Sequence, residues 1–198
     1  MELVIKIKEP KIIDQVFNSN DFEILKSLFK NVKSFEFQNG FSRYVAADNS
    51  ITELKNYANM LIPKAREIFE SNNLLPTYTL FSHYEGPKAS LYKHKDDNAC
   101  TYTIDLCVYQ HTPWELWVEN KPYTLLPNQA LAYYGNDQLH WRESFPNPNE
   151  NYVAMIFFHF AQPDHWFFTK GPSYLSVIRK ELTEEQWYNT KIGGPNGN

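Results

Sequence analysis

The stretch 90–106, "SLYKHKDDNACTYTIDL", sets His94 and Asp96 two positions apart, directly before a predicted strand. Residues two apart on an extended backbone point to the same face. An imidazole and a carboxylate on one face form either a solvated ion pair of small energetic value or two ligands of a metal ion. Other features of the sequence are needed to distinguish these two interpretations.

Strands follow this stretch. Within 101–110, Ile104 and Leu106 alternate with Asp105 and Cys107, which is the period-2 pattern of a half-buried strand. Short runs of β-branched and aromatic residues predict five more strands, at 77–84, 114–118, 123–126, 129–135 and 152–160. Turn residues predict a hairpin turn at 119–122 and a longer loop at 145–151.

The first 75 residues read mainly as helix, after a short opening strand "VIKI". Apolar residues at helical spacing predict one helix with Ser19 or Asn20 as its N-cap. A second begins with the capping-box pair Ser50 and Glu53. Pro63 interrupts the second helix, so we expect a kink there or a split into two helices.

Helices followed by antiparallel strands predict one mainly β domain, a β-sandwich or jelly roll backed by N-terminal helices. We expect residues 1–75 to form mainly helical support, 76–162 the jelly-roll core, and 163–198 a C-terminal extension. A chain of 198 residues is long enough to bury such a core.

Composition argues against several classes of partner. The net charge of −4 and pI near 5.9 leave a nucleic-acid partner unsupported. No signal peptide or membrane-spanning run is visible, so we expect a cytoplasmic protein with no membrane partner. Cys100 and Cys107 would lie about 23 Å apart on one strand, too far for a disulfide. Reduced thiols fit the cytoplasm.

His140 supplies a third candidate ligand. It lies in "LLPNQALAYYGNDQLHWRESF", residues 125–145, two hairpins after His94. A jelly roll can bring the ends of two such strands together at the mouth of the barrel. Two histidines and one carboxylate leave coordination positions open, which is the arrangement of non-haem Fe(II) oxygenases. The sequence therefore predicts a metal site at His94, Asp96 and His140.

With these residues in place, the chain resembles the 2-oxoglutarate/Fe(II)-dependent oxygenases, in particular their prolyl-4-hydroxylase-like branch. The resemblance spans roughly residues 10–162 and includes an opening helix within 13–29. The segments that carry it read "HYEGPKASLYKHKDD", "TYTIDLCVY", "LLPNQALAYYGNDQLHW" and "YVAMIFFHF", in the family's order.

The resemblance implies a double-stranded β-helix in which His94, Asp96 and His140 hold Fe(II). It also implies 2-oxoglutarate and O2 as co-substrates, with release of succinate and CO2 as a C–H bond of the substrate is hydroxylated or otherwise oxidised. Tyr84 matches a family tyrosine that binds a carboxylate of 2-oxoglutarate. The expected substrate is a small molecule or an amino-acid-like group.

One departure from the family concerns the far carboxylate of 2-oxoglutarate. The family usually places an arginine or lysine on the strand after the distal histidine, whereas this chain reads "NPNENYVAMIF" there. Arg142 shares the face of His140 on an extended backbone and can grip a carboxylate through two hydrogen bonds. We expect Arg142 to be the anchor; a surface arginine stacked on Trp141 is the alternative.

Two residues, Trp117 and Trp141, are the candidates for facing the substrate. His159 lies in an apolar run, so we interpret it as a hydrogen-bonded core histidine. Two other functions stay open. One is a cupin-like metal enzyme that does not use 2-oxoglutarate. The other is a non-catalytic β-sandwich module that binds a ligand through its aromatic face.

Overall fold

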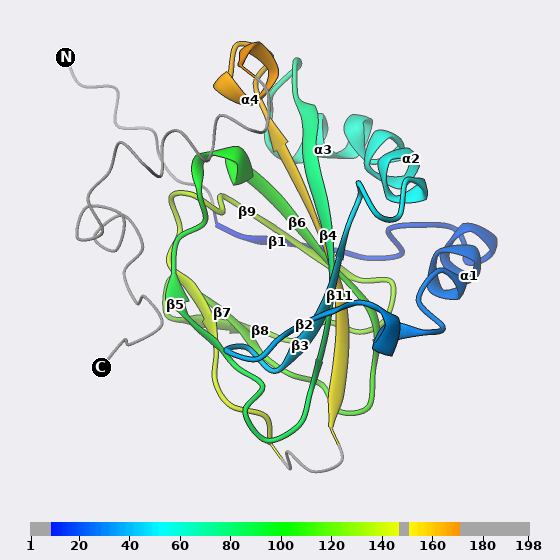
Figure 1. The fold of residues 1–198 in the computed structure, drawn as a ribbon. Helices are drawn as coiled ribbons and strands as arrows, with labels where there is room; N and C mark the ends of the chain where they lie inside the picture. The colour runs from blue at the N-terminus through cyan, green and yellow to red at the C-terminus, as the bar shows by residue number, and fades with distance from the viewer. Residues whose placement is uncertain (1–8, 147–150, 171–198) are drawn as a thin grey trace.

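The computed structural model describes residues 9–146 and 151–170 (Figure 1). Within them, two antiparallel sheets face each other. The larger sheet has the order β1-β9-β6-β11-β4-β3-β2, and the smaller has the order β5-β10-β7-β8. The larger sheet comprises β1 (Lys11–Ile13), β2 (Glu36–Gln38), β3 (Arg43–Ala47), β4 (Leu75–Glu85), β6 (Tyr102–Gln110), β9 (Ala130–Tyr133) and β11 (Tyr152–Ala161). The smaller comprises β5 (Leu91–His94), β7 (Leu116–Val118), β8 (Lys121–Tyr123) and β10 (His140–Arg142).

The chain crosses between the sheets repeatedly from β4 to β11. Strands β4, β6, β9 and β11 lie in the larger sheet, while β5, β7, β8 and β10 lie in the smaller one. Figure 1 shows the two sheets curving around a central space. This is the connectivity of a double-stranded β-helix, so the predicted jelly roll is confirmed.

Helices cover the outer face of the larger sheet, as Figure 1 shows for α1, α2 and α3. Leu25 of α1 and Leu54 of α2 are fully buried in one cluster with Phe81, Ile104 and Phe158 of the sheet. Burying such side chains contributes roughly 1.5–3 kcal/mol each. The helical elements are α1 (Ser19–Ser27), α2 (Glu53–Met60), α3 (Ile62–Ile68), α4 (Trp166–Thr169) and the 3-10 turns η1 (Val32–Ser34) and η2 (Asn98–Cys100).

A second core lies between the two sheets. Leu116 and Val118 of β7 pack there with Leu131 of β9 and Met155 of β11. This inner core fills only part of the space between the sheets, because the remainder is the cavity described below.

The helix boundaries correct two predictions. Asn18, not Ser19 or Asn20, caps α1, because its side-chain oxygen accepts the backbone N–H of Asp21 at 2.9 Å. The capping box at Ser50 is wrong as well. The backbone N–H of Ser50 bonds the carbonyl of Ala47 in a tight turn after β3, so α2 begins only at Glu53.

Pro63 splits the long helix as predicted. It lies in the first turn of α3, where its missing N–H costs nothing. No helix in the described ranges is long and apolar enough to cross a membrane.

The hairpin between β7 and β8 displaces one predicted strand. Glu119 and Asn120 both have positive φ, 49° and 66°, which is the pattern of a two-residue hairpin turn. The strand therefore begins at Lys121, and the strand expected at 123–126 overlaps β8 only at Tyr123.

The first 75 residues contain more than the predicted helices. Strands β1, β2 and β3 extend the larger sheet at both edges. Of these, β3 pairs with β4 along five residues, from Arg43 opposite Tyr84 to Ala47 opposite Leu80. The predicted opening strand "VIKI" and most of the predicted extension from residue 163 lie outside the described residues.

Candidate metal centre

His94 and His140 meet across two neighbouring strands of the smaller sheet. His94 ends β5 and His140 begins β10, and the two are direct partners in the antiparallel register. Asp96 follows just beyond β5, where its backbone N–H donates to the carbonyl of Gly135 at 2.8 Å. Strand pairing and this hydrogen bond therefore bring all three predicted ligands to one place.

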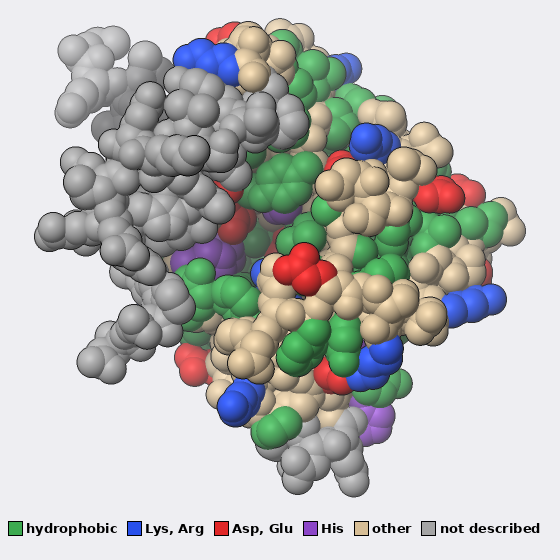
Figure 2. Space-filling model, viewed as in Figure 1, with side chains coloured by type: hydrophobic (Ala, Val, Ile, Leu, Met, Phe, Trp, Pro, Cys, Tyr) green, Lys and Arg blue, Asp and Glu red, His purple; other side chains and the backbone are tan. Residues whose placement is uncertain are grey.

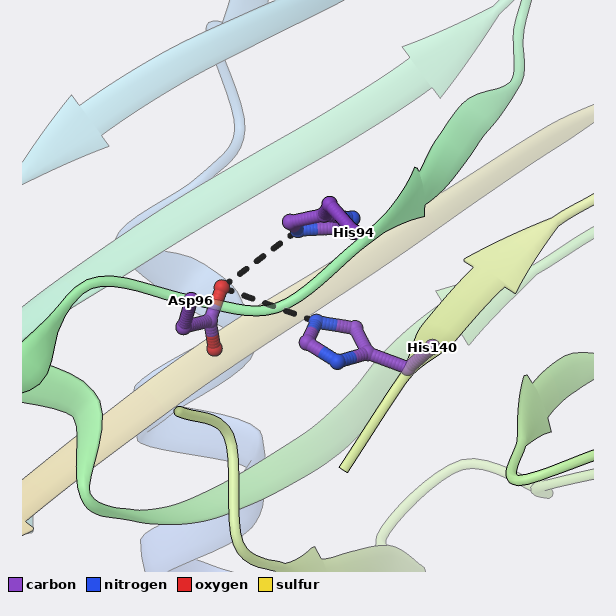
Figure 3. A group of neighbouring side chains, drawn as sticks. All are labelled: His94, Asp96 and His140. Atoms are coloured by element: carbon purple, nitrogen blue, oxygen red, sulfur yellow. Dashed lines mark ion pairs between the residues drawn. The ribbon is translucent and has the colours of Figure 1, made fainter. Parts of the chain in front are cut away.

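One carboxylate oxygen of Asp96 faces both imidazoles (Figure 3). Its Oδ1 lies 3.4 Å from Nε2 of His94 and 3.5 Å from Nε2 of His140. The Nδ1 atoms of these histidines bond the carbonyls of Tyr92 and Gln138, at 2.8 and 2.9 Å. A carbonyl only accepts, so each Nδ1 carries the proton and each Nε2 presents its lone pair in the neutral ring. This is the tautomer that a metal ligand needs.

Burial and mutual charge oppose each other in this cluster. Burial alone would raise the pKa of Asp96, but the two imidazoles, His140 foremost, hold it well below its usual value. Burial would likewise lower the pKa of His140, and the carboxylate beside it raises that pKa instead. For His94, burial and the neighbouring His140 lower the pKa. Asp96 therefore keeps its negative charge, which favours a bound cation.

The three residues fit a divalent metal with open coordination positions. Their ligand atoms all lie within 4.8 Å of one another, and the set of two imidazoles and one carboxylate is that of non-haem Fe(II) sites. His94 and His140 are buried, and the Asp96 side chain is 20% exposed. All three ligands line one cavity.

That cavity has a volume of about 280 Å³ and lies between the two sheets. Besides the three candidate ligands, its lining includes Arg43, Tyr84, Asp105, Tyr133 and His159. Figure 2 shows the surface hollowed over the centre of the barrel, with histidine and acidic side chains visible in the hollow. The candidate metal centre therefore opens into a chamber with both polar and aromatic walls.

Asp105 and Tyr133 form a buried pair beside the metal centre. The Tyr133 hydroxyl donates to Oδ2 of Asp105 at 3.0 Å, and the Tyr133 ring packs edge-on against His140. Burial raises the pKa of Asp105 to about 7. The other oxygen of Asp105 is buried without a hydrogen-bond partner among the described residues. This pair holds the ring of His140 in place.

Gly135 leaves room for the Asp96 carboxylate. A Cβ atom built on Gly135 would lie 2.6 Å from Oδ2 of Asp96. It would also lie 2.5 Å from Oγ1 of Thr103 and 2.7 Å from the carbonyl oxygen of Cys100. Any larger residue at this position would push the carboxylate or the backbone away.

Tyr84 and Arg142, the predicted contacts of 2-oxoglutarate, have different surroundings. Tyr84 lines the cavity, as expected for such a contact. Arg142 is buried, stacks over the Trp114 ring at 4.9 Å and donates to the Trp114 carbonyl. It is not part of the cavity lining, although it lies near Tyr84 and Asp105.

Trp117 and Trp141 lie on the opposite face of the smaller sheet. They are register partners on β7 and β10, and their rings stack at 5.7 Å. Trp141 falls between His140 and Arg142, so strand alternation turns it away from the interior. Neither tryptophan lines the cavity, so the structure does not bring them to the predicted substrate pocket.

His159 is buried and hydrogen-bonded as predicted, with Nδ1 at 3.2 Å from the Tyr78 carbonyl. Unexpectedly, its ring lines the cavity. Cys100, which is not disulfide-bonded, lies in the same wall. Together with Asp96 these two residues form a second group that could hold a metal ion.

Two charged wall residues, Arg43 and Asp105, were not predicted from the sequence. Asp105 gave a readable signal, because it is an acid in the middle of an otherwise apolar strand. Arg43 gave none, since it reaches the cavity only through the pairing of β3 with β4.

Comparison with known proteins identifies the fold. No protein-family model and no curated protein sequence matches the chain. Among solved structures, the α-ketoglutarate-dependent carbocyclase SnoK of nogalamycin biosynthesis superposes with a TM-score of 0.64 at 8% identity, over 78% of this chain and 80% of SnoK. HygX of Streptomyces hygroscopicus, solved with nickel and 2-oxoglutarate, has a TM-score of 0.59 at 10% identity, covering 78% and 83%.

A prolyl-4-hydroxylase of Pseudomonas putida has a TM-score of 0.55 at 8% identity, covering 77% of this chain and 92% of that enzyme. Identities this low establish the architecture alone. The chain has the jelly-roll fold of the 2-oxoglutarate/Fe(II) oxygenases, as the sequence resemblance predicted.

Proposed function

We propose that this protein is an Fe(II)- and 2-oxoglutarate-dependent oxygenase. The observation that carries the proposal is the convergence of His94, Asp96 and His140 in a cavity of about 280 Å³. Many folds accommodate unrelated functions, so this site supports the proposal more directly than the architecture does. The superposed oxygenases, one of them with 2-oxoglutarate bound, support the same conclusion.

Residues of the cavity wall would bind the metal and orient 2-oxoglutarate. His94, Asp96 and His140 would hold the metal, and the cavity that they line would leave room for further ligands. When bound, Fe(II) with 2-oxoglutarate supplies the oxidising power that transfers oxygen from O2 to a C–H bond, with release of succinate and CO2. Tyr84 lies in the wall where it can bind a carboxylate of 2-oxoglutarate. The walls exclude bulk water from the reacting groups.

The cavity favours a small substrate. A volume of about 280 Å³ accommodates the co-substrate and part of a small molecule or amino-acid-like group. HygX was solved with hygromycin B bound, and a prolyl hydroxylase from Trichoplax adhaerens with a peptide. A cytoplasmic location is part of the proposal, because neither Cys100 nor Cys107 forms a disulfide, as expected in a reducing compartment.

Anaerobic titration tests the proposal. Apo-protein receives Fe(II) and then 2-oxoglutarate, while the weak visible charge-transfer band of the iron–2-oxoglutarate chelate is followed. We expect the band in the wild type and its loss in His94→Ala. His111→Ala is the matched control, since His111 is exposed and outside the cavity.

The outcomes separate the competing functions. Iron binding without a band at any 2-oxoglutarate concentration would favour a cupin-like metal enzyme that does not use this co-substrate. A protein that binds no iron, with a stability indifferent to chelators, would favour a non-catalytic binding module. Loss of the band in both histidine variants would indicate damage to the fold rather than to the metal site.

A further inference from the structure

Arg43 is a cation in the cavity wall that the sequence did not predict. It comes from β3, which precedes the jelly-roll strands in the chain. Its Nε donates to Oε1 of Gln38 and its Nη1 to the hydroxyl of Tyr84, both at 2.8 Å. The guanidinium also lies over the Phe41 ring at 4.5 Å. Hydrogen bonds and stacking therefore hold it in one orientation.

The positive charge of Arg43 has no carboxylate partner among the described residues. None of the ion pairs found there includes it. Glu85, next to Tyr84 on β4, pairs instead with Lys33 and His83. A guanidinium has five N–H groups and only two are used in the bonds above, so others are available to a ligand. A half-buried cation in this state favours an anion in the cavity.

The Tyr84 hydroxyl completes a site for a carboxylate. It accepts a hydrogen bond from Arg43 and so retains its own proton for donation. A carboxylate that meets both groups would accept from the guanidinium and from the hydroxyl. Tyr84 itself is fully buried and packs edge-on against Trp114, so the hydroxyl is held in position.

Strand register shows why the cation comes from β3. Arg43 pairs with Tyr84, and Tyr84 pairs with Val153 of β11. Val153 and Met155 belong to the apolar inner core. Strand β11, which follows His140, therefore has no charged side chain opposite Tyr84. Strand β3, on the other side of β4, has Arg43 there.

Arg142 is the weaker candidate for the same role. Its guanidinium already donates to the Trp114 carbonyl and stacks on the Trp114 ring. It lies outside the cavity lining, whereas Arg43 lies within it. Its surroundings are those of a buried arginine that ties the β7 side of the barrel to β10.

We propose that Arg43, together with the Tyr84 hydroxyl, binds the far carboxylate of 2-oxoglutarate. The inference rests on the proposed function and makes it more specific. It assigns co-substrate selectivity to a strand outside the jelly-roll core, in place of the sequence-based assignment to Arg142.

The test compares two oxo acids that differ only in the group Arg43 would bind. 2-Oxovalerate has the length of 2-oxoglutarate but ends in a methyl group. Affinities for both are measured from the charge-transfer band of the anaerobic Fe(II) protein, in the wild type and in Arg43→Gln, Arg43→Lys and Arg142→Met. Arg66→Gln is the control, an arginine of α3 that bonds the Leu74 carbonyl away from the cavity.

The wild type should bind 2-oxoglutarate more tightly than 2-oxovalerate, on the order of 10- to 100-fold. Arg43→Gln should lose most of that preference by weakening 2-oxoglutarate alone, because 2-oxovalerate never used the guanidinium. Arg43→Lys should restore part of it, since lysine keeps the charge without the planar fork. Arg142→Met and Arg66→Gln should retain the preference.

Two results would overturn the inference while leaving the proposed function intact. The first is a preference that survives in Arg43→Gln, and the second is a preference that is lost in Arg142→Met. Unchanged binding of 2-oxovalerate by Arg43→Gln shows that the variant is folded. If the wild type forms no band with either oxo acid, the proposed function itself fails and this inference fails with it.

Discussion

The two faces of β6 show how differently one strand serves fold and function. On the outer face, Ile104, Leu106 and Val108 are fully buried in the core formed with the helices. On the inner face, Asp105 is equally buried but has a carboxylate oxygen without a partner among the described residues. Apolar packing alone accounts for the outer face. The inner face carries polar groups that packing does not need, which is expected where a ligand binds.

The largest expected effect concerns the outer face. Leu106→Ala removes a fully buried side chain and leaves a cavity, so we expect a loss of about 2–5 kcal/mol in the free energy of unfolding. Urea denaturation measures this. Fe(II) affinity of the protein that remains folded should be unchanged. A simultaneous large loss of metal affinity would show that the two faces are not independent.

Asp105 on the inner face should make stability depend on pH. Its pKa is about 7 in the folded protein, against roughly 3.9 in an unfolded chain. The folded state therefore binds more protons between these values, and stability falls as pH rises from about 4 to 7. The slope is on the order of 1 kcal/mol per pH unit. Stability is full below the unfolded pKa and lowest above the folded one.

Asp105→Asn is the matched variant, because the amide keeps the shape of the side chain and cannot titrate. The free energy of unfolding of the metal-free protein is measured between pH 4 and 8. The decrease with rising pH that Asp105 causes should appear in the wild type and be absent from Asp105→Asn. An identical slope in both proteins would contradict the raised pKa of Asp105.

Gly135→Ala should affect both fold and site. The added Cβ would press on Asp96, Thr103 and the Cys100 carbonyl, at least one of which is rigid backbone. We expect a loss of about 1–3 kcal/mol in stability, as for other overpacked sites, together with weaker Fe(II) binding. Equilibrium dialysis measures the second effect. Unchanged metal affinity would mean that Gly135 does not support Asp96.

The smallest effect is expected at Trp117, on the outer face of the smaller sheet. Trp117→Phe keeps an aromatic ring against Trp141, so stability should change by less than about 1 kcal/mol. Affinity for 2-oxoglutarate and turnover of any substrate should remain as in the wild type. A selective loss of substrate turnover would restore Trp117 as a pocket residue.

The positions of His94 and Asp96 and the two faces of β6 could be predicted, because each follows from the spacing of residues within one segment of the sequence. The spacing of His94 and Asp96 on an extended segment places both on one face, and strand alternation separates the two sides of β6. The same alternation places Trp141 on the face opposite His140, so the position of that tryptophan was readable from the sequence as well.

Other features depend on contacts between distant segments. Arg43 reaches the cavity because β3 pairs with β4, and no local sequence pattern predicts that pairing. Turn geometry also determines where strands begin. The positive φ angles of Glu119 and Asn120 form the turn after which β8 starts. Helix starts followed the backbone turn after β3 rather than the capping-box pattern at Ser50.

The central proposal is that His94, Asp96 and His140 together bind one metal ion in the wall of the cavity. Anomalous diffraction from crystals grown anaerobically with Fe(II) and 2-oxoglutarate tests it most directly. We expect one anomalous peak among Nε2 of His94, Nε2 of His140 and Oδ1 of Asp96, with 2-oxoglutarate beside it. No peak at these atoms, or iron bound only elsewhere, would contradict it.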